Sequence, residues 1–219
     1  MKKLLIPLVC SLIAAWSCNL EGSYSAQNVW DIVTIQQHKL VNDSGVVYNV
    51  SSAPKDMPEL EEGKRYYLVF DILNKSYEIA VQTCLPVAIL VPTPADEAEE
   101  ITAHDPILVQ FNYIGSKYID LGFNYYYDDR SNCAHEVFGR YTISVDPQDG
   151  NHILNLSLYH DGNSENPAVM DEASLKLGTR IVSIPVDAWD FKAVTLTVDI
   201  LSTNDDGKYV VESKTYPSR

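Results

Sequence analysis

Basic residues are scarce in this 219-residue chain. Lysine and arginine number 16 against 30 aspartate and glutamate residues, which gives a formal net charge of -14. No stretch gathers the cluster of cations that nucleic-acid phosphates or anionic lipid headgroups require. The composition therefore excludes nucleic acid as a natural partner, and we expect any attachment to a membrane to be covalent.

Long apolar runs are also lacking. The one continuous example, Leu4 to Ala15, is interrupted by Ser11 and is shorter than the roughly 20 residues that a membrane-spanning helix needs. Lys2 and Lys3 precede it and give it a positive start. A short basic segment followed by a short apolar one is typical of an export leader that is removed from the mature protein.

The leader ends at a cysteine. The sequence Ala14-Ala15-Trp16-Ser17-Cys18 resembles a bacterial lipobox, in which small residues precede a cysteine that is diacylated before cleavage. Bulky Trp16 departs from the tightest form of the motif, and ordinary cleavage after Ser17 is the alternative. We predict that Cys18 is lipidated, that residues 1–17 are a lipoprotein signal peptide and that residues 18–27 are a polar tether. The lipid would attach the protein to the outer membrane, on its periplasmic or its surface face.

Cysteines are few after the leader is removed. Cys84 and Cys133 remain, and an exported location permits a disulfide between them. They fall in different predicted domains, and a buried, small apolar side chain is the simpler role for Cys84. The sequence leaves the pairing open.

Alternation of apolar and polar residues predicts a small β-domain over residues 28–95. A turn at 42–45 and another at 74–76 separate the expected strands. These strands are 29–35, 46–50, 66–73, 77–83 and 87–91. Residues 96–104, which are acidic and lack an apolar period, are expected to be a linker.

The same alternation is clearer over residues 105–219. Ile107, Val109, Phe111 and Tyr113 are expected to face one way on the first strand. Further apolar faces comprise Ile119, Leu121, Phe123, Tyr125 and Tyr127; Tyr141, Ile143 and Val145; and Leu154, Leu156 and Leu158. Strands are also expected at 181–186, 194–200 and 209–212, and only Asn166 to Leu177 has a helical period. This pattern predicts an antiparallel β-sandwich, and an all-β protein overall.

Three segments carry a resemblance to a known family. They are Gly63-Lys64-Arg65-Tyr66-Tyr67-Leu68-Val69-Phe70, Asp105-Pro106-Ile107 and Asn155-Leu156-Ser157-Leu158-Tyr159-His160-Asp161. With the leader and its cysteine, and with Phe111-Asn112-Tyr113-Ile114-Gly115, they resemble the NigD-like lipoproteins of Bacteroidetes. The resemblance implies an N-terminal OB-like barrel, a C-terminal β-sandwich and lipid on the cysteine. The family name comes from a bacteriocin operon, so an immunity role is implied as one alternative, and no catalytic residue is supplied.

Catalytic and metal-binding patterns are weak. Cys133-Ala134-His135-Glu136 places a thiol two residues from an imidazole, yet nothing identifies an oxyanion hole or the third and fourth ligands of a zinc site. The acidic turns with Asp128, Asp129 and Asn132, and with Asn204, Asp205 and Asp206, do not have the spacing of a calcium-binding EF-hand loop. We therefore expect a non-enzymatic protein without metal or cofactor, and the alternative is a hydrolase that uses Cys133 or His135.

Tyrosine is abundant, with 14 residues, and exposed rings are good contacts for sugars and proteins. In Tyr125-Tyr126-Tyr127 the alternation predicts that Tyr126 is exposed between two buried neighbours. Tyr126, Asp128, Asp129 and Arg130 are therefore the expected surface binding site. Tyrosine also favours strands for reasons of packing alone. The expected function is that of an envelope lipoprotein that binds a protein partner or a glycan.

Overall fold

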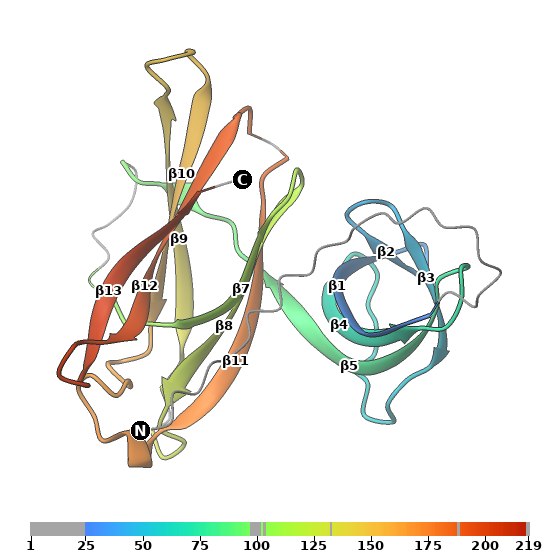
Figure 1. Cartoon of the computed structure of the whole chain (residues 1–219), viewed down its shortest axis with the longest axis horizontal. Helices are drawn as coiled ribbons and strands as arrows, with labels where there is room; N and C mark the ends of the chain where they lie inside the picture. The colour runs from blue at the N-terminus through green and yellow to red at the C-terminus, as the bar shows by residue number, and fades with distance from the viewer. Residues whose placement is uncertain (1–24, 97–101, 103, 132, 188, 218–219) are drawn as a thin grey trace.

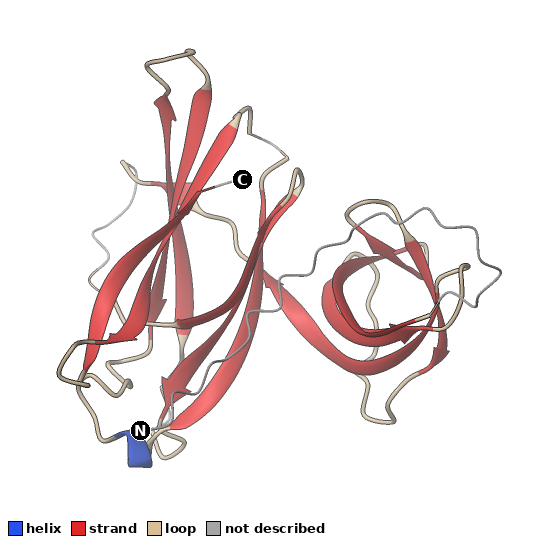
Figure 2. Cartoon of the chain, in the orientation of Figure 1, coloured by secondary structure: helices blue, strands red, loops and turns tan. Residues whose placement is uncertain are grey.

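The computed structural model describes residues 25–96, 102, 104–131, 133–187 and 189–217. The predicted leader, Cys18, most of the tether and linker, and Asn132 lie outside these residues. The described chain is built almost wholly of strands, with one short 3-10 turn at Glu172–Ser174 (Figures 1 and 2). The prediction of an all-β protein is confirmed. No helix in the described ranges is long and apolar enough to cross a membrane.

The first five strands form a closed barrel. They are β1 (Ala26–Gln36), β2 (Lys39–Asn42), β3 (Val47–Ser52), β4 (Arg65–Ile72) and β5 (Glu78–Ile89). Their order is β3-β2-β1-β4-β5, and a parallel pairing of β3 with β5 closes the ring. Alternate residues point inward, as the sequence pattern predicted, and bury Val33, Leu68 and Phe70 completely. This small closed barrel agrees with the expected OB-like domain.

Strand β5 is longer than the sequence pattern indicated. The expected strands 77–83 and 87–91 are one continuous strand, Glu78–Ile89, whose last residues leave β4 and pair with β11 (Lys176–Pro185). Figure 1 shows β5 running out of the barrel toward the second half of the chain. One eight-stranded sheet therefore passes from the barrel into the sandwich.

The remaining strands form a sandwich. They are β6 (Thr93–Pro94), β7 (Leu108–Ile114), β8 (Tyr118–Tyr127), β9 (Glu136–Val145), β10 (His152–Asp161), β11, β12 (Ala193–Thr203) and β13 (Tyr209–Pro217). One layer has the order β11-β8-β7 and the other β13-β12-β10-β9-β6. The pairing of β10 with β12 is parallel, which corrects the purely antiparallel expectation. The reason is that the chain crosses to the opposite layer as β11 before it returns beside β10.

Two local predictions on the sandwich are wrong. The only helical part of the segment 166–177 is the 3-10 turn, and its last two residues begin β11, because Val169 is 65% exposed and Leu177 52% exposed, so an apolar helix stripe would have nothing to pack against. On β9, Ile143 and Val145 are exposed, because the β9–β10 hairpin extends beyond the facing layer (Figure 1). The buried core comes instead from strands such as β8 and β10, where Leu121 is fully buried.

Candidate functional site

Three aromatic rings meet where the barrel lies against the sandwich. Trp30 on β1 and Tyr67 on β4 point outward from the barrel, and Phe111 comes from β7 of the sandwich. The ring centroids of Trp30 and Phe111 are 4.9 Å apart, those of Tyr67 and Phe111 5.6 Å, and those of Trp30 and Tyr67 5.9 Å. The interplanar angles are 32°, 15° and 28° in the same order. The rings therefore pack against one another, with their planes 15–32° apart, in a cluster drawn from both halves of the chain.

A β-bulge places Phe111 in this cluster. The register between β7 and β8 shifts between Val109 and Phe111, so Val109 packs into the sandwich core whereas Phe111 faces the barrel. The prediction that both residues share one face is therefore wrong. Phe111 lies across Gly122 of β8, where an added Cβ would stand 2.1 Å from the ring. Only glycine leaves room for the ring to reach Trp30.

A small apolar cluster lies beneath the rings. Ile32 of β1, Val87 of β5 and Ile181 of β11 are buried together, with Tyr67 and Phe111 packed against them. These residues exclude water from the joint between the two halves of the molecule. The rings of Tyr67 and Phe111 are therefore supported from below by buried apolar side chains.

Arg65 holds the two halves together through its charge. Its side chain is 1% exposed and donates two hydrogen bonds to Asp43 of the barrel, at 2.7 and 3.0 Å. It also reaches Asp120 of the sandwich at 3.3 Å and Ser183 at 3.0 Å, and it lies 3.7 Å from the ring centroid of Tyr118. Burial by itself would lower the pKa of Arg65, but the two carboxylates outweigh it and the pKa is raised. The guanidinium is therefore a fixed charge inside the joint.

The aromatic cluster is accessible at its edge. Trp30 is 45% exposed, and Leu85, which is the cross-strand neighbour of Tyr67, is 37% exposed. We call Trp30, Tyr67, Leu85 and Phe111 the junction patch. Exposed aromatic rings on a rigid support are the usual anchors of binding surfaces. Within the described chain, this patch has the geometry that best suits a binding site.

A second cluster is polar and buried in the sandwich. His135 Nδ1 is 3.1 Å from His160 Nε2, and His135 Nε2 is 3.4 Å from a Glu165 carboxylate oxygen. Glu165 also accepts hydrogen bonds from the hydroxyl of Ser131 and, at 2.6 Å, from the backbone N–H of Asp128. Burial would raise the pKa of Glu165, but these hydrogen bonds outweigh it and lower the pKa. With Glu165 ionised and His135 neutral, the proton of His135 lies on Nε2, and His135 Nδ1 then accepts from His160 Nε2–H.

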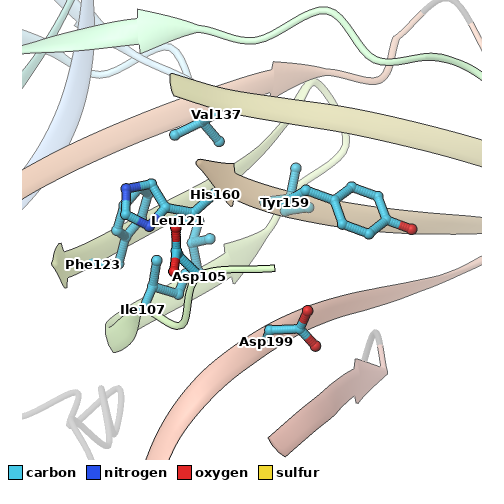
Figure 3. A pocket seen from close by; sticks show the side chains of 9 residues that line it. Asp105, Ile107, Leu121, Phe123, Val137, Tyr159, His160 and Asp199 are labelled. Carbon is cyan, nitrogen blue, oxygen red and sulfur yellow. The ribbon is translucent and has the colours of Figure 1, made fainter. Parts of the chain in front are cut away.

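This chain of hydrogen bonds leaves Nδ1 of His160 without a donor or acceptor among the described residues. His160 lines a small cavity with Asp105 and Phe123, which has room for about one water molecule (Figure 3). Burial, followed by the neighbouring His135, lowers the pKa of His160 to about 4. The imidazole is therefore neutral near pH 7. The cavity is too small for an organic substrate.

The structure does not assemble the cysteine and histidine that a hydrolase would use. Both ring nitrogens of His135 are engaged with His160 and Glu165, whereas the thiol of Cys133 contacts the amide of Asn163 at 3.2 Å. No hydrogen bond between Cys133 and His135 occurs in the described part of the chain. Cys84 and Cys133 are both free thiols, which answers the question that the sequence left open.

The residues expected to form a surface site are bonded to one another or to near neighbours. Asp128 is 8% exposed and accepts hydrogen bonds from the guanidinium of Arg130 at 2.6 to 3.2 Å, and Asp129 pairs with Lys176. Tyr126 is only partly exposed, because Glu172 lies 3.4 Å from its hydroxyl. The prediction of an exposed Tyr126 is therefore wrong. The side chains of Arg130 and Asp129 remain 72% and 46% exposed, and ligand binding at this site stays a prediction.

Metal binding finds no support in the acidic turns. The carboxyl of Asp128 is covered by Arg130, and the amide oxygen of Asn204 accepts from the backbone N–H groups of Asp206 and Lys208, as turn residues do. Among the described residues, no group of three or more histidine, cysteine or acidic side chains is placed to hold a metal ion.

Comparison with solved structures identifies the fold. A NigD-like immunity protein from Bacteroides caccae aligns with a TM-score of 0.54 at 15% identity, over 91% of this chain and 99% of that one. The chain has the NigD-like fold. The same fold occurs in a protein of unknown function from Bacteroides vulgatus, with a TM-score of 0.55 at 15% identity, over 89% of this chain and 92% of that one. A candidate lipoprotein from Bacteroides fragilis has a TM-score of 0.54 at 13% identity, over 88% and 97%. No family model and no curated protein matches the sequence.

Sequence reasoning identified the NigD-like fold but not the junction patch. Trp30 and Tyr67 occupy outward positions of amphipathic strands, which an alternating pattern assigns to solvent. An outward tryptophan is costly to expose, and that was the available signal. Arg65 carried no signal, because an outward arginine at the start of a strand is ordinary.

Proposed function

We propose that this protein is a non-enzymatic, lipid-anchored binding protein of the cell envelope and that the junction patch is its binding surface. The observation that carries the proposal is the packed aromatic cluster of Trp30, Tyr67 and Phe111, with Trp30 45% exposed. The cluster is built from both halves of the chain and rests on a buried floor, so it is presented rigidly. Preorganised aromatic surfaces bind without a large ordering cost.

Lipid attachment rests on the lipobox-like sequence before Cys18. The fold likeness to a candidate lipoprotein of Bacteroides fragilis supports the same location. Replacing Cys18 by serine is expected to abolish incorporation of an alkyne palmitate analogue and to release the protein from the membrane fraction. The measurement is metabolic labelling followed by fluorescent detection in a gel. Labelling that persists in the Cys18→Ser variant would place the lipid elsewhere.

Binding through the junction patch is tested with the mature chain from residue 19, purified without lipid. It is expected to sediment with envelope fragments of the producing species, and Trp30→Ala is expected to lose about tenfold or more in apparent affinity. Val211→Ala, at a 43% exposed position on β13, is the matched control and should bind as the unaltered protein does. Equal sedimentation of Trp30→Ala and Val211→Ala would show that the junction patch does not take part in binding.

An immunity role is the second candidate, because a NigD-like immunity protein has the same fold over nearly its whole length. The junction patch would then contact a secreted toxin at the membrane surface. A deletion strain separates the two functions. It becomes sensitive to a rival's toxin only under the immunity role, and the Trp30→Ala protein would then fail to restore resistance.

A further inference from the structure

The outer face of the barrel continues from the junction patch to a polar edge. Trp30 pairs with Val69 of β4, and Asp71 lies two residues further along the same face, a distance of about 7 Å. Asp71 Oδ1 accepts hydrogen bonds from Gln82 Nε2 and from the backbone N–H of Asn28, both at 2.8 Å. On this outer face the strand position of Trp30 is thus followed by a fixed carboxylate and amide.

Acceptor atoms remain available at this edge. Asp71 Oδ2 and Gln82 Oε1 accept no hydrogen bond from the part of the chain that the structure describes. Asp71 is held by its two contacts, so its free oxygen has a defined direction. Sugar hydroxyls are donors that pair with such acceptors, and an ionised acceptor makes a hydrogen bond about twice as strong as a neutral one.

Ring geometry favours a sugar over an extended apolar peptide. The indole of Trp30 packs against Phe111 and Tyr67 at interplanar angles of 32° and 28°, which fixes its orientation, and the residue remains 45% exposed. The exposed part of a fixed indole offers no pocket for a projecting side chain, whereas the C–H face of a pyranose lies flat on an aromatic ring. The polar edge then contacts the hydroxyls at the rim of the same sugar.

Charge restricts the sugar further. The formal net charge of -14 and the carboxylate of Asp71 at the edge of the site both repel anionic glycans. We propose that the site formed by Trp30, Tyr67 and Phe111 with Asp71 and Gln82 binds a neutral sugar ring of an envelope or host glycan. This inference rests on the proposed function and names its ligand class.

Tryptophan fluorescence provides the test. The chain has three tryptophans, one of which leaves with the leader, and Trp189 packs against the sandwich core and Tyr141. A Trp189→Phe background therefore reports Trp30 alone. The probes are neutral mannose, glucose and galactose oligosaccharides selected by a glycan array, with polygalacturonate as the acidic comparison. A neutral oligosaccharide is expected to change the Trp30 emission saturably, and polygalacturonate is not.

Two variants assign the contacts. By calorimetry, Trp30→Ala is expected to weaken binding of the selected neutral oligosaccharide at least about tenfold, and Asp71→Asn about three- to tenfold. Thr83→Ala, an exposed position on the same face, should change neither, and urea unfolding confirms that each variant is folded. Absence of neutral-sugar binding, or binding that Trp30→Ala leaves unchanged, overturns the sugar assignment. If sedimentation with envelope fragments still depends on Trp30, survives periodate oxidation of the glycans and is lost on protease treatment, the binding function stands and its ligand is a protein.

Discussion

Replacement of Arg65 by methionine is expected to lower the free energy of unfolding by about 3–5 kcal/mol. The reason is that Asp120 is 2% exposed and would lose its cation, whereas Asp43 lies nearer the surface. Burial already raises the pKa of Asp120 even though Arg65 opposes the effect. Urea denaturation near pH 7 measures the change, which would remove a large share of the 5–15 kcal/mol typical of a folded domain.

Two further variants make this expectation specific. Combining Arg65→Met with Asp120→Leu should recover most of the lost stability, because a buried ion pair exchanged for apolar groups is close to neutral. Arg140→Met is the control, since Arg140 is only partly buried and contacts Thr93 near the surface. A loss below about 1 kcal/mol for Arg65→Met, as for surface pairs, would mean that the joint does not depend on this charge.

Acidification is expected to destabilise the protein between about pH 6.5 and pH 4 through His160. An unfolded histidine binds its proton near pH 6.5, whereas the folded pKa of His160 is about 4 because of burial and the neighbouring His135. The unfolded state therefore binds more protons in this range, and stability falls as the pH falls. The stability that depends on a neutral His160 is present in full above the pKa of the unfolded histidine and is lost as the pH falls to the folded pKa of about 4. The difference between the unfolded and folded pKa values of His160 corresponds to about 3 kcal/mol of stability.

The measurement is the free energy of unfolding at a series of pH values. His160→Phe, which cannot take up the proton, should flatten the slope between pH 6.5 and 4, whatever its effect at pH 7. His152→Asn alters an exposed histidine at the start of the same strand and should keep the slope. An unchanged slope in His160→Phe would show that other groups cause the acid sensitivity.

The close packing around this histidine pair explains why Gly162 is present. A Cβ at that position would stand 2.9 Å from His160 and 3.0 Å from His135. The imidazoles are further enclosed by Tyr125, whose ring centroid is 4.8 Å from that of His135. Both imidazoles are therefore enclosed in the sandwich, and their ring nitrogens contact each other and Glu165, apart from Nδ1 of His160.

The sequence predicted the parts of the fold that follow from local alternation. Val33 and Ile35 inside the barrel, and Leu154 and Leu156 inside the sandwich, are buried where a period of two places them. The prediction failed for Phe111, because one extra residue in β7 reverses the face without any unusual residue to mark it.

The candidate site was not predictable for a different reason. Trp30 and Arg65 occupy the outer face of the barrel, and only the position of the sandwich converts one into an edge of an aromatic patch and the other into a buried charge. That information lies in contacts between residues that are far apart in the sequence. Trp30 and Phe111, for example, are separated by more than 80 residues. A single sequence gives no direct signal of such contacts.

Photo-cross-linking in living cells tests the junction patch most directly. A benzoylphenylalanine residue at position 85 replaces Leu85, which is 37% exposed beside Tyr67, and the same residue at position 211 replaces Val211 on the remote strand β13. We predict a defined adduct with an envelope component from position 85, lost when Trp30→Ala is added, and none from position 211. Equal adducts at both positions, or an adduct at position 85 that does not depend on Trp30, would contradict the account.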